Sequence, residues 1–106
     1  MPKKAMDSLT ESMFYVLMAL GRGPMCGIDI AQAIDRCTGG RLRIGPATLY
    51  TILGKFEKEQ YIREVAVEGR KRTYQITPRG STAYREELQR LRQCIEDAER
   101  MEGGGL

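Results

Sequence analysis

The chain has 106 residues, the length of one small domain, and 42% of them are apolar and 29% charged. These fractions are typical of a globular protein and exclude a disordered one. The chain has no histidine and three cysteines, Cys26, Cys37 and Cys94, without the CxxC spacing of a metal site. Because histidine is the commonest general base and metal ligand, the composition argues against an enzyme. We expect no cofactor and no metal.

Positive charge is concentrated in the middle of the chain. Between Arg36 and Ile76, nine Lys and Arg residues stand against four acids, a net charge of +5, whereas residues 1–35 and residues 77–106 each carry −1. A localised excess of this kind is the footprint that a phosphate backbone attracts. It also fits an ordinary solvated basic face, so charge alone does not decide between the two.

The chain shows no sign of a membrane or secretory segment. Its longest wholly apolar run, Met13–Leu20, has eight residues, well short of the ~20 that span a bilayer. The first eleven residues, MPKKAMDSLTE, lack the apolar region of a secretory signal. We therefore expect a cytoplasmic location and no membrane partner.

Capping signals and periodicity predict two helices in the first third of the chain. The first runs over 8–21, with Ser8 opening an SLTE capping box and GRGP ending the helix. Its residues 13–20 are apolar nearly all round, so it must be covered on more than one side, and a second cover could come from another chain. The second helix is predicted over Gly27–Cys37, with an inner stripe of Ile30, Ala31 and Ile34.

A short strand and a third helix are expected next. Leu42 and Ile44 alternate with arginines, which suits a strand, and Gly45-Pro46 opens a helix over 45–60. One face of this helix is apolar: Leu49, Ile52, Leu53 and Phe56. The other face is thin and weakly charged, and it carries Ala47, Thr48, Thr51, Gly54, Lys55 and Lys58, with Tyr50 on its flank.

Alternating residues then predict a hairpin with strands near 62–67 and 72–76, and Gly69 allows a positive φ in its turn. A last helix is predicted over 78–102, with Thr77 as N-cap and Pro78 in its first turn, followed by a flexible tail at 103–106. Its apolar residues recur at steps of four and three: Tyr84, Leu88, Leu91, Ile95 and Ala98. Two heptads are too few for a free coiled coil, so this seam must pack on its own domain, on a second copy, or on both.

The order of elements indicates a mainly α protein with a small β-hairpin (α+β). We interpret residues 1–77 as a winged helix-turn-helix DNA-binding domain and residues 78–102 as a C-terminal dimerisation helix. A helix that enters the major groove needs small side chains where it approaches the bases, which the thin face of the third helix supplies. Recognition helix 45–60 and wing 68–73 are thus predicted to bind double-stranded DNA, through Gly45, Pro46, Ala47, Thr48, Tyr50, Thr51, Lys55, Lys58, Arg70, Lys71 and Arg72. Tyr50 could instead anchor the wing against the helix.

Three motifs in chain order resemble the PadR family of bacterial transcriptional regulators. GRGPMCGIDIAQAI is similar to the family's first loop and second helix, GPATLYTILGKFEKEQYI to its recognition helix, and EGRKRTYQITPRG to its wing and the start of its last helix. The chain departs from the family pattern at Cys26 and Ile28, where aromatic residues are common.

The resemblance covers nearly the whole chain and suggests the small subclass with a single C-terminal helix. It implies a homodimer, built from helix 8–21 and the last helix, that binds an inverted-repeat operator, usually as a repressor. Together with the apolar first helix and the seam, this predicts a dimer interface of Phe14, Leu17, Tyr84, Leu88, Leu91, Ile95 and Ala98.

Several alternatives stay open at this point. A winged helix can serve as a protein–protein interaction module without specific DNA binding, although the basic wing and the small-residue face argue against it. The cysteines fit small buried hydrophobes, or a thiol redox sensor if one is exposed with a lowered pKa. A small-molecule effector could change the spacing of the two recognition helices, but only by binding the two arrangements with different affinity.

Overall fold

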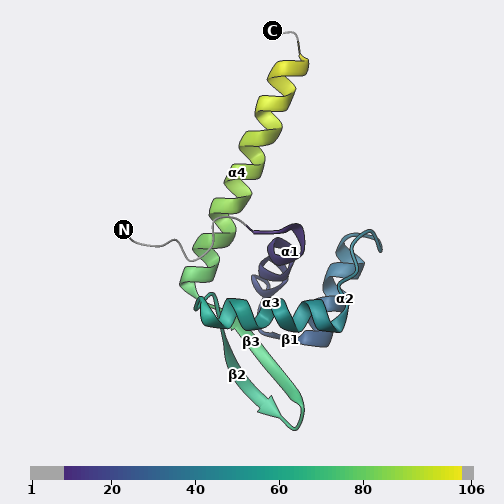
Figure 1. Ribbon diagram of the computed structural model, residues 1–106, viewed down its shortest axis with the longest axis vertical. Coiled ribbons are helices and arrows are strands. Elements are labelled where there is room, and N and C mark those ends of the chain that lie inside the picture. Colours follow the sequence, from purple (N-terminus) through teal and green to yellow (C-terminus); the bar gives the residue numbers. More distant parts are fainter. Residues whose placement is uncertain (1–8, 104–106) are drawn as a thin grey trace.

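The computed structural model describes residues 9–103; Ser8 and residues 104–106 of the expected tail lie outside that range. The elements are α1 (Glu11–Leu20), β1 (Met25–Cys26), α2 (Gly27–Cys37), α3 (Pro46–Lys58), β2 (Ile62–Glu68), β3 (Lys71–Ile76) and α4 (Pro78–Glu102). Helices α1, α2 and α3 form a body from which the β2–β3 hairpin projects in one direction and α4 in the other (Figure 1). The predicted α+β winged-helix architecture with a long last helix is confirmed.

Helix α1 begins later than predicted and is capped by a different residue. Thr10 is the N-cap, and its Oγ1 accepts a hydrogen bond from the Met13 amide at 3.2 Å. Both Ser8 and Thr10 are good capping residues, so sequence could not decide between them. The all-round apolar character of α1 is largely explained inside one chain, because α1 packs against α2, α4 and β3.

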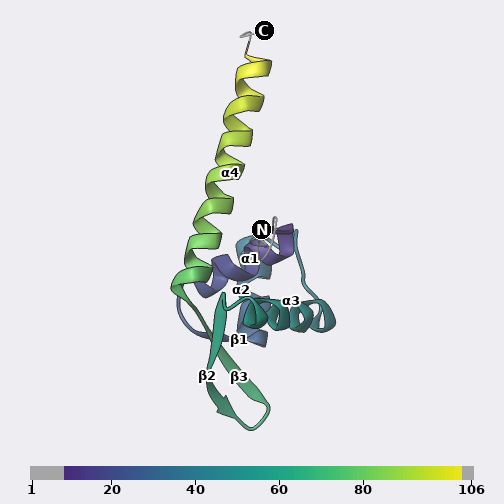
Figure 2. The same cartoon turned by 60° about the vertical axis from the view of Figure 1, so that its left-hand side comes forward.

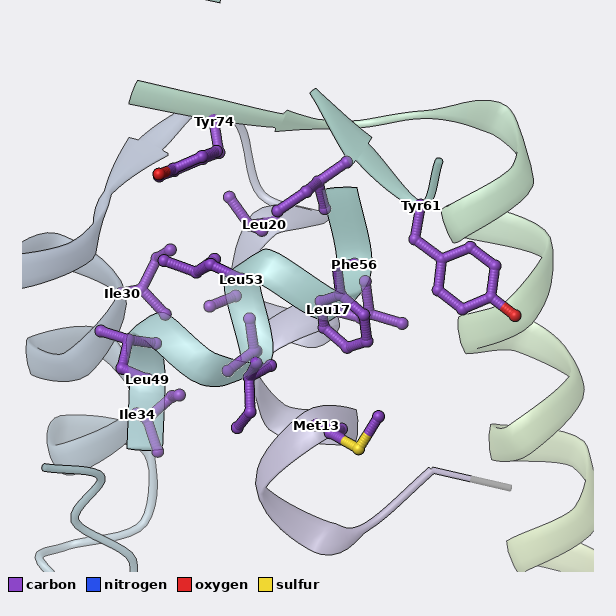
Figure 3. Close-up of a cluster of buried hydrophobic side chains, with 14 residues drawn as sticks. Met13, Leu17, Leu20, Ile30, Ile34, Leu49, Leu53, Phe56, Tyr61 and Tyr74 are labelled. Carbon is purple, nitrogen blue, oxygen red and sulfur yellow. The ribbon is translucent and has the colours of Figure 1, made fainter. Parts of the chain in front are cut away.

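One hydrophobic cluster lies between the three short helices and the sheet (Figure 3). The predicted stripe of α3 is entirely buried, with Leu53 and Phe56 at most 1% exposed. The predicted stripe of α2 is also inward-facing, with Ile30 and Ile34 buried and Ala31 packed against the cluster. Because α3 gives one side to this core, its opposite side is left at the surface.

The predicted strand at residues 42–44 is wrong. Leu42 and Ile44 do pack against the core, but from a loop without sheet pairing, and this loop is held by the Leu42 amide donating to Thr38 Oγ1 at 3.1 Å. The third strand is β1, which pairs antiparallel with β3 in the order β1-β3-β2. Two alternating apolar side chains can therefore reach a core without any strand partner.

Helix α4 starts as predicted and is locked onto the base of the hairpin. Thr77 Oγ1 accepts from the Gly80 amide at 3.1 Å and donates to the Gln60 carbonyl at 2.6 Å. Gly80 is buried against the backbone of Tyr61. From Arg92 to Gly103 every residue is exposed, and this part of α4 extends away from the body in both views (Figures 1 and 2). Within residues 9–103, no helix has the length and apolar character that a membrane crossing requires.

Candidate nucleic-acid interface

The outer face of α3 is available along its whole length. All eight positions at which we predicted DNA contacts on this helix are exposed: Gly45, Pro46, Ala47, Thr48, Tyr50, Thr51, Lys55 and Lys58. The helix itself begins at Pro46 and ends at Lys58, slightly inside the predicted range. Its small residues come first and its lysines last, so the face is thinnest near the N-terminus.

The N-terminus of α3 keeps hydrogen-bond donors for a ligand. Its N-cap is Gly45, which has no side chain to accept from the first-turn amides. Unpaired amides at a helix N-terminus attract anions. Thr51 is different, because its hydroxyl donates to the Ala47 carbonyl at 3.0 Å. The Thr51 oxygen can therefore only accept from a ligand while that bond is kept.

The tip of the hairpin carries three exposed basic residues, but they are not equivalent. Gly69 adopts φ 63° in the turn, and Arg70, Lys71 and Arg72 follow it. Arg72 Nη1 lies 2.8 Å from Glu64 Oε1, and this hydrogen bond and charge raise the pKa of Arg72. Within the described residues, Arg70 and Lys71 make no ion pair, so they are the free cations of the wing.

A surface hollow of about 780 Å³ connects the wing to the helices. We call it the wing hollow, and it is lined by Cys26, Gly27, Ile28, Asp29, Tyr50, Glu57, Arg70, Lys71, Arg72 and Tyr74. It therefore brings the predicted Tyr50 and the three wing cations together with the first turn of α2 and with Tyr74. We predicted neither as part of the site: the first turn of α2 reaches the hairpin through the β1–β3 pairing, and Tyr74 was expected only as a residue of the second hairpin strand.

Tyr50 leans toward α2. Its hydroxyl lies 3.3 Å from the place where a Cβ on Gly27 would stand, and the side chain is 55% exposed. Tyr50 is thus positioned over the start of α2 while still presenting surface to a ligand. This neighbour belongs to α2 and not to the wing, so the contact differs from the alternative in which Tyr50 anchors the wing against α3.

The predicted dimer residues fall into three groups. Phe14 stacks on Tyr84 with ring centroids 5.1 Å apart. Leu88 and Leu91 are half-buried, whereas Ile95 and Ala98 are exposed, Ile95 at 57%. Leu17 is 0% exposed in the core of its own chain, which leaves it no surface for a partner.

The cysteines do not share one environment. Cys26 is buried, as expected, but Cys37 and Cys94 are exposed, so the expectation of small buried hydrophobes is wrong for these two. Cys37 is the last residue of α2, and Cys94 lies in the part of α4 that extends away from the body. In the part of the chain that the structure describes, no group of three or more His, Cys, Asp or Glu residues could hold a metal ion.

Comparison with known proteins gives one family. The model of the transcriptional regulator PadR-like family matches residues 16–86. The chain is similar to the structure of a transcriptional regulator from Clostridium thermocellum, with 27% identity, coverage of 83% of this chain and 89% of that chain, and a TM-score of 0.74. It shares the fold of Bacillus subtilis PadR in complex with operator DNA, with 22% identity, coverage of 74% and 48%, and a TM-score of 0.66.

A curated relative is much longer than this chain. An uncharacterized 37.1 kDa protein in transposon TN4556 of Streptomyces fradiae is 39% identical over 70 residues, which are 66% of this chain. The match spans only 20% of that relative, about a fifth of its length.

The fold and the matched family define the class as a winged-helix transcriptional regulator rather than an enzyme. The family model covers well over half of the chain, from α1 into α4. The chain belongs to the transcriptional regulator PadR-like family.

Proposed function

We propose that this chain is a sequence-specific DNA-binding repressor that occupies an inverted-repeat operator as a homodimer. The observation that carries the proposal is the side-by-side exposure of the thin face of α3 and the free cations Arg70 and Lys71 of the wing. A thin helix fits the ~12 Å major groove, and cations on a projecting hairpin reach the adjacent minor groove or backbone. The operator complex of Bacillus subtilis PadR, which has the same fold, supports this role.

In this arrangement the two ends of α3 have different tasks. The uncapped N-terminus at Gly45 and the small residues Ala47 and Thr48 make the close approach to the groove. Lys55 and Lys58, in the last turns, contact phosphates beside the groove. Base edges are then read by Thr48 and Tyr50, and the lysines contribute affinity without sequence preference.

The second protomer covers the seam of α4. Beyond Leu91 this helix has no support from its own chain, yet the seam continues with Ile95, which is 57% exposed, and with the exposed Ala98. Apolar side chains repeated along one face of an unsupported helix are buried when a second α4 pairs with it. The interface then consists of the Phe14–Tyr84 stack, Leu88, Leu91, Ile95 and Ala98, without Leu17.

The dimer gives an effector a way to act. Two recognition helices must lie about one helical turn of DNA, ~34 Å, apart to occupy two half-sites. A small molecule that binds one spacing more tightly than the other would release or fix the repressor.

The test is selection of duplexes from a random pool, followed by fluorescence-anisotropy titration of the enriched duplex at several salt concentrations. We expect a palindromic motif. We also expect Arg70→Ala/Lys71→Ala/Arg72→Ala to weaken binding to every duplex. Because Arg72 is already paired with Glu64, the salt slope should fall by about two units rather than three.

The control removes the same charge from exposed positions of α4, in Arg85→Ala/Arg92→Ala/Arg100→Ala. Above its base, this helix extends away from α3 and the wing (Figure 1). The control variant should change the salt slope by less than half as much. Failure to enrich a motif, together with equal effects of the two triple variants, would refute specific DNA binding and favour a protein–protein interaction module.

Dimerisation is tested separately by light scattering. Ile95→Asp should convert the dimer to a monomer, whereas the exposed Gln93→Asp, which is off the seam, should not. A wild-type chain that is monomeric at the concentrations of the DNA titration would overturn this part of the proposal.

A further inference from the structure

The wing hollow lies where a DNA strand must pass if the proposed function holds. A major and an adjacent minor groove are separated by one sugar–phosphate backbone. If α3 occupies the first groove and the wing the second, that backbone crosses the space between them, and this space is the wing hollow. We propose that the wing hollow is a backbone site, in which one phosphate is bound by the Tyr74 hydroxyl and the first-turn amides of α2. The inference rests on the proposed function and adds contacts that it does not contain.

Tyr74 is the first support for this site. It is 4% exposed, and its ring lies at the margin of the core (Figure 3). Its hydroxyl forms no hydrogen bond with any residue in the range 9–103, although the buried polar side-chain atoms of that range are all satisfied. The hydroxyl must therefore reach solvent, and Tyr74 lines the wing hollow. A side chain that is almost wholly buried, but whose unpartnered hydroxyl opens into a hollow, is placed to donate to a ligand there.

The start of α2 is the second support. This 11-residue helix has Cys26 as its N-cap, and no side chain accepts from its first-turn amides. Gly27, Ile28 and Asp29 of that turn line the same hollow as Tyr74, because Met25 and Cys26 pair with Tyr74 and Thr73. Amides at a helix N-terminus bind phosphate well.

The charges around the hollow suit a phosphodiester, which carries one negative charge. Arg70 and Lys71 are free, Arg72 is paired with Glu64, and the acids Asp29 and Glu57 also line the hollow. The charges of these side chains therefore nearly cancel, and the excess positive potential in the hollow comes from the α2 amides. A strongly anionic ligand, such as a phosphate monoester, would meet the two carboxylates.

The apolar part of the lining suits the sugar. Ile28 is 66% exposed although it is a large aliphatic residue, and the neighbouring Tyr50 ring is 55% exposed. Together they offer a surface for deoxyribose carbons beside the bound phosphate. This gives a reason for an exposed isoleucine at the second residue of α2.

Tyr74→Phe tests the site by removing one hydroxyl and leaving the packed ring. We expect its affinity for the duplex enriched by the wild-type chain to fall about tenfold, the size of a lost hydrogen bond to a charged group. Its salt slope should not change, because no cation is removed. The matched control is Tyr61→Phe, another nearly buried tyrosine, which packs against Phe56 and Arg79 and does not line the hollow. Thermal melts verify that both variants are folded.

A duplex with single neutral methylphosphonates identifies the phosphate. At one position per half-site, this substitution should weaken binding by the wild-type chain. The same substitution should weaken binding by Tyr74→Phe only a little further, because that variant already lacks the hydroxyl contact. Asp29→Asn should tighten binding of the unmodified duplex. If Tyr74→Phe binds like the wild type while the triple wing variant does not, the backbone site is refuted and the proposed function stands. If the wild-type chain enriches no duplex, both the backbone site and the proposed function are refuted.

Discussion

The junction between α4 and the hairpin provides the sharpest test of the packing. A Cβ added at Gly80 would stand 2.1 Å from the Tyr61 carbonyl oxygen, 2.9 Å from its carbon and 3.0 Å from Ile76 Cγ1. Two of these atoms are backbone, so the strain cannot be relieved by a rotamer change. Helix α4 and the hairpin would have to separate by about 1 Å. Overpacking of this kind lowers the free energy of unfolding by ~1–3 kcal/mol. The shift would also strain the bond from the Thr77 amide to the Tyr61 carbonyl, now 2.9 Å.

Gly80→Ala should therefore lower the free energy of unfolding by about 2 kcal/mol, after allowance for the better helix propensity of alanine. Gly54→Ala is the matched control, because Gly54 lies inside α3 with nothing within 4 Å of the added methyl. It should raise the free energy of unfolding by ~0.5–1 kcal/mol. Urea unfolding followed by circular dichroism, at one fixed protomer concentration, measures both. Equal values for the two variants would refute the close contact at Gly80.

Three further predictions concern single side chains. Thr77→Ala should destabilise the protein by ~1–2 kcal/mol in urea unfolding, because it removes the N-cap of α4 and the bond to the Gln60 carbonyl; a change below ~0.5 kcal/mol would contradict it. Glu64→Gln should release Arg72 and tighten DNA binding by about threefold in anisotropy, since exposed ion pairs are weak; unchanged or weaker binding would mean that Glu64 orients Arg72 for DNA. Burial raises the pKa of Tyr74 above its ordinary value of 10.0, so the unfolded chain ionises first as pH rises. The stability that Tyr74 contributes is complete below about pH 10 and is lost as the pH rises from there through the raised folded pKa. Tyr74→Phe should therefore flatten the decline of the free energy of unfolding above about pH 10.

Local sequence signals predicted the elements that depend on local interactions. The bounds of α2 agree with its periodicity and the glycines that follow it, and the start of α4 agrees with its Thr-Pro signal. The prediction of a strand at residues 42–44 was wrong, because alternation shows only which side chains face a core. Strand β1 was missed for the complementary reason: two residues have no period, and their partner on β3 lies almost fifty residues away.

The same distinction separates the predicted and unpredicted parts of the candidate site. The exposed face of α3 follows directly from its buried stripe, so Thr48 and Lys55 could be placed from sequence. The wing hollow could not, because it exists only where α2, α3 and β3 meet. Tyr74 in particular looks like an ordinary inward-facing strand residue until its unpartnered hydroxyl is seen.

The length of α4 makes the helix a lever arm. The helix has 25 residues and is therefore about 37 Å long, and it is fixed to the hairpin base at Gly80. If the proposed partner holds the far end, a rotation of α4 by about 5° about that end would move the winged-helix body by ~3 Å over that length. This is close to the ~3.4 Å rise between base pairs. In the proposed dimer, so small a rotation at the far end of α4 would thus put the two recognition helices about one base pair out of step with their half-sites.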